Sequence, residues 1–177
     1  MKTHIVLLRG INVSGQKLIK MEDLRKAFAD AGFPGARTLI QSGNIVVRAD
    51  GTHDVMAKTT RTIIADAFGF EVEVIVLSVA ELREAVAAIP FDGPGNKVFA
   101  VFLSSEPPLA AFDHFNSLEF GSDCVKLMGQ VLYIHYGDSA GTSKLTINLI
   151  EKKLGVTGTA RNVNTCRKLL EVASIAG

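Results

Sequence analysis

The pattern of apolar and polar residues divides the first half of the chain into strands and helices. An unbroken apolar run predicts a strand, apolar residues at helical spacing predict a helix, and two β-branched runs around a short glycine-bearing turn predict a hairpin. In chain order these patterns give a strand at 5–8, a helix at 21–31, hairpin strands at 37–41 and 44–48, a helix at 53–68 and a strand at 72–77. The predicted order is βαββαβ.

The same order begins again after a short helix at 81–88 and a loop rich in proline and glycine at 90–95. The second set comprises a strand at 98–103, a helix at 109–117, strands at 124–128 and 131–136, a helix at 143–154 and an extended piece at 157–160. A last helix at 163–173 would turn Cys166, Leu169, Leu170 and Ala173 inward.

A repeated order without residue identity between the halves predicts an α+β fold. We expect two tandem ferredoxin-like α/β plait subdomains with an extra C-terminal helix. The expected boundaries are 1–79 for the first subdomain, 80–96 for a helical linker and 97–177 for the second subdomain with the C-terminal helix.

Composition indicates an ordered globule, because 47% of the 177 residues are hydrophobic and 21% are charged. No stretch approaches the roughly 18 apolar residues of a membrane helix, and the N-terminal apolar run is too short for a signal peptide. We therefore expect a cytoplasmic protein without a membrane partner. Cys124 and Cys166 form no CxxC pair and the four histidines lack metal-ligand spacing. This pattern predicts buried thiols, no metal and no cofactor.

Charge is distributed unevenly along the chain although the formal net charge is only +1. Residues 1–26 and 143–177 each carry six basic residues against two acidic ones, whereas the middle carries seven against fourteen. If the fold brings the ends together, they form a positive region that attracts phosphate or nucleic acid. Solvated helix faces explain the same lysines equally well.

The loop that follows the first strand is the first candidate site. Gly10 and Gly15 have the separation of P-loop glycines, but Gln16 stands where that motif needs lysine, and no Ser or Thr follows Lys17. A nucleotide triphosphatase is therefore not expected. A looser anion site fits better, and its candidate residues are Arg9, Asn12, Lys17 and Lys20. The alternative is a wide loop in which Asn12 only caps its own turn.

Two further polar clusters are candidates. Turn chemistry alone explains Ser42, Gly43 and Asn44 at the hairpin tip, but a turn does not require Gln41. Before the last helix, one asparagine suffices as the N-cap, which leaves an arginine and an amide for an anion at the helix N-terminus. The candidate binding residues of the two clusters are Gln41, Asn44, Arg161, Asn162, Asn164 and Lys168.

Neither a base-stacking platform nor a catalytic set is evident. RNA-recognition domains stack bases on aromatic residues of two central strands, and the runs at 5–8 and 45–47 contain none. The second half offers Phe99, Tyr133 and His135, which are more often core residues. No Ser/His/Asp or Cys/His set is close in sequence, although distant residues can meet in space. Whether the chain is an enzyme stays open, and its catalytic residues are unassigned.

Several segments together resemble one family. They are Leu7–Val13 with the following Gly15 and Lys17–Met21, Gln41–Asn44, Ser143–Leu145, and Thr159–Asn162 with Asn164-Thr165. On these motifs nearly the whole chain resembles the mostly bacterial family named domain of unknown function 1697. The resemblance implies two linked α/β plait subdomains and no particular activity. Val163 stands where many relatives are expected to carry tryptophan, which argues against a stacking role here.

We expect a non-catalytic protein whose three polar clusters converge on a phosphate-bearing small ligand or a nucleic-acid segment. The small net charge argues against strong nonspecific nucleic-acid binding, which needs many phosphate contacts. One alternative is an enzyme of unidentified reaction that uses the same pocket, with Lys17 or Arg161 stabilising charge. Another is a protein-interaction module whose polar clusters only join the two halves. The sequence does not decide among them and does not specify an oligomeric state.

Overall fold

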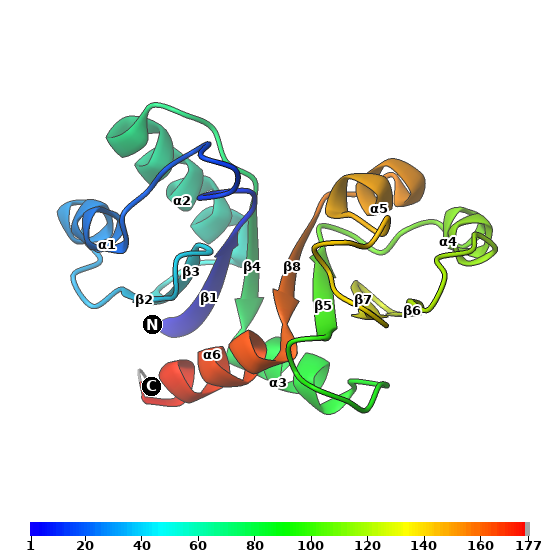
Figure 1. Cartoon of the computed structure of the whole chain (residues 1–177). Helices are drawn as coiled ribbons and strands as arrows, with labels where there is room; N and C mark the ends of the chain where they lie inside the picture. Colours follow the sequence, from blue (N-terminus) through cyan, green and yellow to red (C-terminus); the bar gives the residue numbers. More distant parts are fainter. Residues whose placement is uncertain (176–177) are drawn as a thin grey trace. The chain divides into compact units, whose positions relative to one another are not determined.

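The computed structural model describes residues 1–175, which form two four-stranded antiparallel sheets with helices (Figure 1). The first set of elements is β1 (Lys2–Leu8), α1 (Met21–Asp30), β2 (Arg37–Leu39), β3 (Asn44–Ala49), α2 (His53–Phe68) and β4 (Val74–Ser78), and α3 (Val79–Ala87) follows it. The second set is β5 (Val98–Leu103), α4 (Leu109–Asn116), β6 (Cys124–Met128), β7 (Val131–His135), α5 (Ile147–Leu154) and β8 (Gly158–Asn162), and α6 (Val163–Ile175) ends the chain.

The chain divides into two compact units. Unit 1 contains residues 1–84 and the C-terminal segment that begins at Arg167, and unit 2 contains Ala85–Cys166. Helices α3 and α6 therefore contribute residues to both units.

Both sheets have the strand order of a ferredoxin-like plait, which is β2-β3-β1-β4 in unit 1 and β6-β7-β5-β8 in unit 2. In unit 1 the central strand β1 places His4 opposite Val47 of β3 and Ser78 of β4. This order confirms the predicted α+β fold of two tandem α/β plaits, each βαββαβ, with an additional C-terminal helix.

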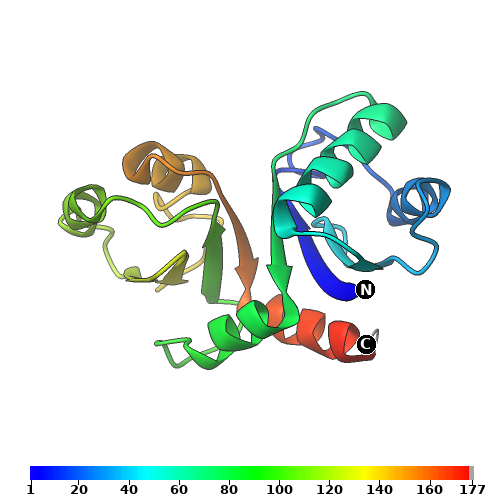
Figure 2. The same cartoon turned by 180° about the vertical axis from the view of Figure 1, so that it is seen from behind.

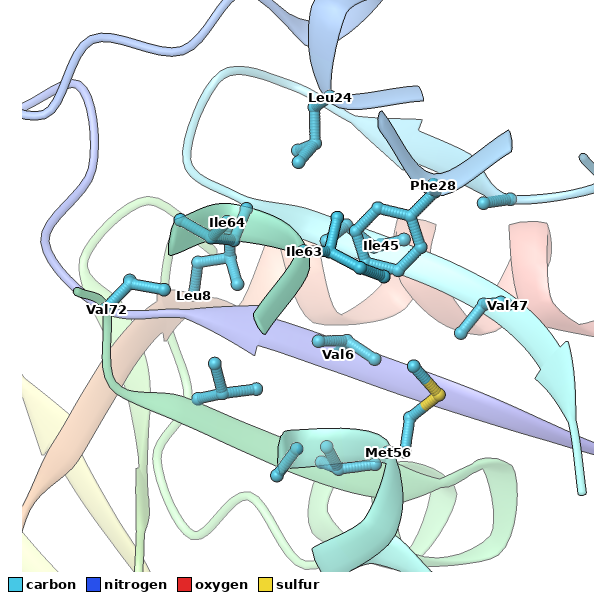
Figure 3. Packing of buried hydrophobic residues seen from close by; sticks show 14 of the residues in the cluster. Val6, Leu8, Leu24, Phe28, Ile45, Val47, Met56, Ile63, Ile64 and Val72 are labelled. Atoms are coloured by element: carbon cyan, nitrogen blue, oxygen red, sulfur yellow. The ribbon is translucent and has the colours of Figure 1, made fainter. Parts of the chain in front are cut away.

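The core of unit 1 lies between its sheet and the two helices α1 and α2, which cover one face of that sheet (Figures 1 and 2). Leu24 and Phe28 are four residues apart on α1, so they extend from the same side of the helix. Figure 3 shows these side chains and those of α2 directed at β1 and β3. The labelled core residues include Val6, Leu8, Ile45, Val47, Ile63 and Ile64, and all are at least nine-tenths buried.

The predicted bounds of a strand and of a helix included residues that the structure places outside these elements. The strand expected at 37–41 ends at Leu39, because Ile40 has a φ of 48°, which no strand residue adopts. The helix expected at 143–154 begins at Ile147, because Thr146 is its N-cap and accepts a hydrogen bond from the Leu149 N–H.

The prediction that both thiols are buried holds for Cys166 and was wrong for Cys124. Strand β6 forms an edge of its sheet, and its side chains alternate between the two faces. Val125 and Leu127 pack against the core of unit 2, so Cys124 belongs to the opposite, exposed set.

Candidate functional site

The loop between β1 and α1 contains an unusual number of residues with left-handed backbone. Asn12, Ser14 and Lys17 have φ values of 54°, 51° and 47°, in addition to two glycines. Residues other than glycine rarely adopt this conformation, and asparagine tolerates it best. The loop therefore folds back on itself, with the Asn12 N–H donating to the Lys17 carbonyl at 3.2 Å.

The side chain of Asn12 joins this loop to the hairpin tip. Its Nδ2 donates to the carbonyl oxygens of Ile19, at 2.9 Å, and of Gln41, at 2.8 Å. Its Oδ1 accepts from the Ile19 N–H at 2.8 Å. The structure thus brings together the first two polar clusters identified in the sequence, both within unit 1.

Hydrogen bonds of a buried asparagine and of the neighbouring strand hold the hairpin tip. Asn44 is fully buried, and its Nδ2 donates to the Leu39 carbonyl at 3.0 Å and to Ser42 Oγ at 2.8 Å. The Leu8 N–H donates to the Gly43 carbonyl at 2.8 Å. Asn44 therefore shapes the turn and does not reach the surface. This agrees with the alternative that turn chemistry alone explains the presence of Asn44.

The two lysines of this loop, Lys17 and Lys20, have different surroundings. The Lys17 ammonium donates to the Glu71 carbonyl at 2.6 Å and lies 5.8 Å from the centre of the Phe70 ring. Lys20 directly precedes α1, is exposed and caps nothing with its side chain. Lys17 is thus held against the α2–β4 loop, whereas Lys20 extends into solvent.

Two more candidate residues, Arg9 and Gln41, belong to this loop and to the hairpin tip. Arg9 is half-buried, and its backbone N–H donates to the Glu73 carbonyl at 2.9 Å. Gln41 is exposed. Among residues 1–175, no hydrogen bond or ion pair is made by the side chains of Gln41 and Lys20. These two polar groups are therefore available to a ligand.

The third polar cluster lies elsewhere in the chain. Arg161 on β8 is only 6% exposed, and its guanidinium donates to Thr159 Oγ1 at 2.7 Å and to the Ala160 carbonyl at 2.8 Å. Burial lowers the pKa of Arg161 to about 10, although the neighbouring Cys166 thiol acts in the opposite direction. This arginine belongs to unit 2 and is a buried residue.

The asparagines of the third cluster have different roles. Asn162 Oδ1 accepts from the Thr165 N–H at 2.9 Å, so Asn162 caps α6. Asn164 is exposed and lies directly against Gly95, where a Cβ would clash with it. Lys168 is exposed on the part of α6 that belongs to unit 1, whereas the other three residues belong to unit 2.

Sequence reasoning missed Phe70 and Glu71 as partners of Lys17. Lys17 and Glu71 are 54 positions apart, and their contact uses a backbone carbonyl, so residue types gave no signal. Over the described part of the chain, no group of three or more His, Cys, Asp or Glu residues could hold a metal ion. The helices of residues 1–175 also include none with the length and apolar character of a membrane span.

Comparisons with known proteins agree with the fold. The model of the family described as "Protein of unknown function (DUF1697)" matches residues 1–133. The solved structure of the conserved bacterial protein SP0830 from Streptococcus pneumoniae is similar, with a TM-score of 0.76 and 19% identity over 98% of this chain and 99% of that one. A comparison with curated proteins found no match. The chain belongs to the DUF1697 family.

Proposed function

We propose that this chain binds a phosphate-bearing ligand without catalysing a reaction, at the end of unit 1 where residues 9–20 meet the hairpin tip. The observation that carries the proposal is the pair of hydrogen bonds from Asn12 Nδ2 to the carbonyls of Ile19 and Gln41. Lys20 is the next residue after Ile19. One side chain therefore joins the two backbone segments that carry the exposed Lys20 and Gln41 side chains.

An ammonium and an amide on two joined segments suit an anionic oxygen-bearing group. The ammonium of Lys20 supplies charge-assisted hydrogen bonds, and the amide of Gln41 supplies two more donors. Glu22 and Asp23 already occupy the first turn of α1, where their negative charges interact favourably with the helix dipole. The lysine and the glutamine, and not the helix terminus, therefore carry the proposed recognition.

The ligand is a small phosphorylated compound or a short nucleic-acid segment. Two exposed groups and the nearby Arg9 offer few phosphate contacts, and extensive nonspecific binding to nucleic acid needs many. A cytoplasmic location, where phosphorylated metabolites and nucleic acids are plentiful, fits this proposal.

The test is a thermal-unfolding screen of the full chain with inorganic phosphate, pyrophosphate, nucleotides, sugar phosphates, and short RNA and DNA. A ligand at 100 times its Kd stabilises the folded state by about 2.7 kcal/mol. Lys20→Ala and Gln41→Ala are expected to retain the unliganded melting temperature and to lose the ligand-induced rise.

Lys58→Ala is the matched control, because Lys58 is an exposed lysine on α2 outside the proposed site. It should respond to ligand as the parent does. The proposal fails if no compound stabilises the parent, or if Lys20→Ala and Lys58→Ala respond equally.

The interaction-module alternative is favoured by a different observation. The polar side chains of Asn12, Asn44, Arg161 and Asn162 all hydrogen-bond to the protein itself. If these clusters are purely structural, Asn12→Ala lowers the melting temperature and no compound in the screen changes that of the parent.

A further inference from the structure

His4 occupies a position in unit 1 that is poorly suited to a histidine. Its side chain is 2% exposed and lies on the same side of β1 as the core residues Val6 and Leu8. Within the described residues, neither ring nitrogen has a hydrogen-bond partner. A neutral imidazole carries one N–H, and leaving a buried donor unsatisfied costs about 1–3 kcal/mol. Packing alone does not explain a polar ring at this position.

A second histidine, His53, packs against His4. His53 is the first residue of α2, and its ring meets that of His4 edge to face, with the centroids 5.8 Å apart and the planes at 79°. His53 is half-exposed, and its Nε2 lies 3.5 Å from Oε2 of Glu81. His53 is thus placed between the buried imidazole and a carboxylate.

Glu81 is fixed at the start of α3. Its Oε2 accepts from the Ser78 N–H at 2.6 Å, and Ser78 Oγ accepts from the Glu81 N–H at 3.1 Å. This reciprocal arrangement is a capping box. A continuous series of contacts therefore runs from β1, through the first residue of α2, to the junction between β4 and α3.

The surroundings of His4 oppose its protonation. Burial has the largest effect and lowers the pKa of His4. The nearby His53 on α2 and Lys2 on the same strand also lower this pKa, while the backbone of Ala49 on β3 raises it. The residue opposite on β4 is the uncharged Ser78. Partial burial raises the pKa of Glu81, but hydrogen bonds with Ser78 and the nearby His53 outweigh it and hold that pKa below its usual value.

We propose that His4, His53 and Glu81 form an acid-responsive latch that fastens the N-terminus of α2 to β1 and to the β4–α3 junction. At neutral pH, His4 is neutral within the core and Glu81 is charged. His53 lies between them, with its ring against that of His4 and its Nε2 3.5 Å from Oε2 of Glu81. Acid protonates His4, which adds a charge to the core, so the latch opens.

The sign of the stability change follows from linkage. The folded state binds a proton at His4 less readily than the unfolded chain does, so the stabilisation from His4 is complete above the ordinary histidine pKa of about 6.5. It is lost as the pH falls below that value. One such group raises the unfolding equilibrium constant by up to about tenfold per pH unit.

The test is chemical unfolding of the full chain from about pH 8 to about pH 5. His4→Phe retains an aromatic ring but cannot titrate, so it is expected to lose most of the pH dependence below about pH 6.5. The control is His114→Gln, because His114 is exposed on α4 in unit 2. It should keep the parental dependence. Equal pH dependence in the parent and His4→Phe overturns the proposal.

A second measurement keeps the proposal testable if His4→Phe does not fold. The ring protons of the four histidines are followed by NMR as the pH of the parent protein is lowered. His4 is expected to titrate below the ordinary histidine pKa of about 6.5. Titration of His4 at or above that value overturns the latch. None of these outcomes depends on a phosphate ligand.

Discussion

The side-chain nitrogen of Asn12 lies 2.8 Å from the carbonyl oxygen of Gln41, a residue 29 positions further along the chain. The same nitrogen donates to the carbonyl of Ile19, and the oxygen of that amide accepts from the Ile19 N–H. One asparagine therefore fixes the loop to the hairpin tip, and its own left-handed backbone is part of the arrangement.

Two substitutions of Asn12 separate the contribution of its side-chain hydrogen bonds from that of its left-handed backbone. Asn12→Gly keeps the left-handed backbone but loses the three hydrogen bonds, and we expect it to destabilise the protein by about 1–3 kcal/mol. Asn12→Ala also adds the steric cost of a left-handed alanine, about 1–2 kcal/mol. Chemical denaturation measures both losses, and amide exchange should show faster opening at the hairpin tip. Equal stability of the two variants would contradict the role of the backbone conformation.

Gly43 is required by close packing as well as by its backbone. A Cβ at Gly43 would lie 2.7 Å from Leu8 Cβ and 2.9 Å from Ile11 Cδ1, whereas a Cβ at Gly15 would meet nothing within 4 Å. Both glycines have left-handed φ values, 76° and 73°. We expect Gly43→Ala to cost about 1–3 kcal/mol more than Gly15→Ala in denaturation experiments, because only Gly43→Ala overpacks the core. Equal losses would show that backbone strain alone matters.

Ile40 combines two unfavourable features. It is β-branched with a φ of 48°, and 53% of its side chain is exposed. Because asparagine tolerates left-handed backbone better, Ile40→Asn is expected to stabilise the fold by about 0.5–1 kcal/mol in thermal unfolding. Leu18→Asn removes another exposed apolar side chain, at a position without positive φ, and should give no such gain. A less stable Ile40→Asn would mean that the isoleucine makes contacts worth more than its strain.

The sequence predicted those parts of the fold that depend on local patterns. The helical spacing of Leu24 and Phe28 reflects a requirement for one apolar face, and both residues are buried in the core of unit 1. Gly155 ends α5 in a left-handed conformation, which a glycine after a helix pattern indicates. Local signals of this kind fixed the element order in both halves, from which the plait topology followed.

The parts that could not be predicted depend on contacts between distant residues. The left-handed conformation that ends β2 at Ile40 contradicts the preference of a β-branched residue. The Ser143 hydroxyl accepts from the Leu145 N–H and donates to Asp123, so this segment is held outside the helix. Burial of Arg161 is a tertiary property that its charge does not indicate. For the candidate site, residue types identified the segments but not their internal partners.

The two tyrosines of the chain provide a spectroscopic test of two buried hydroxyl groups in unit 2. The Tyr133 hydroxyl donates to the Ala85 carbonyl at 2.6 Å, and the Tyr136 hydroxyl donates to the Leu145 carbonyl at 3.0 Å. Burial raises the pKa of each from 10.0 to about 12, with smaller contributions from Cys166 to Tyr133 and from Asp123 to Tyr136. The folded state therefore favours the neutral phenols.

The chain has no tryptophan, so the ultraviolet absorbance of tyrosinate reports on these two groups without interference. At about pH 11 we expect little tyrosinate in the folded protein and extensive ionisation after unfolding. The stabilisation is complete below pH 10 and is lost between pH 10 and about pH 12, by up to about 1.4 kcal/mol per pH unit for each tyrosine. Tyr133→Phe and Tyr136→Phe should each remove one of the two contributions to this slope. Ionisation of the folded protein near pH 10 would show that the phenols are not held by these buried hydrogen bonds.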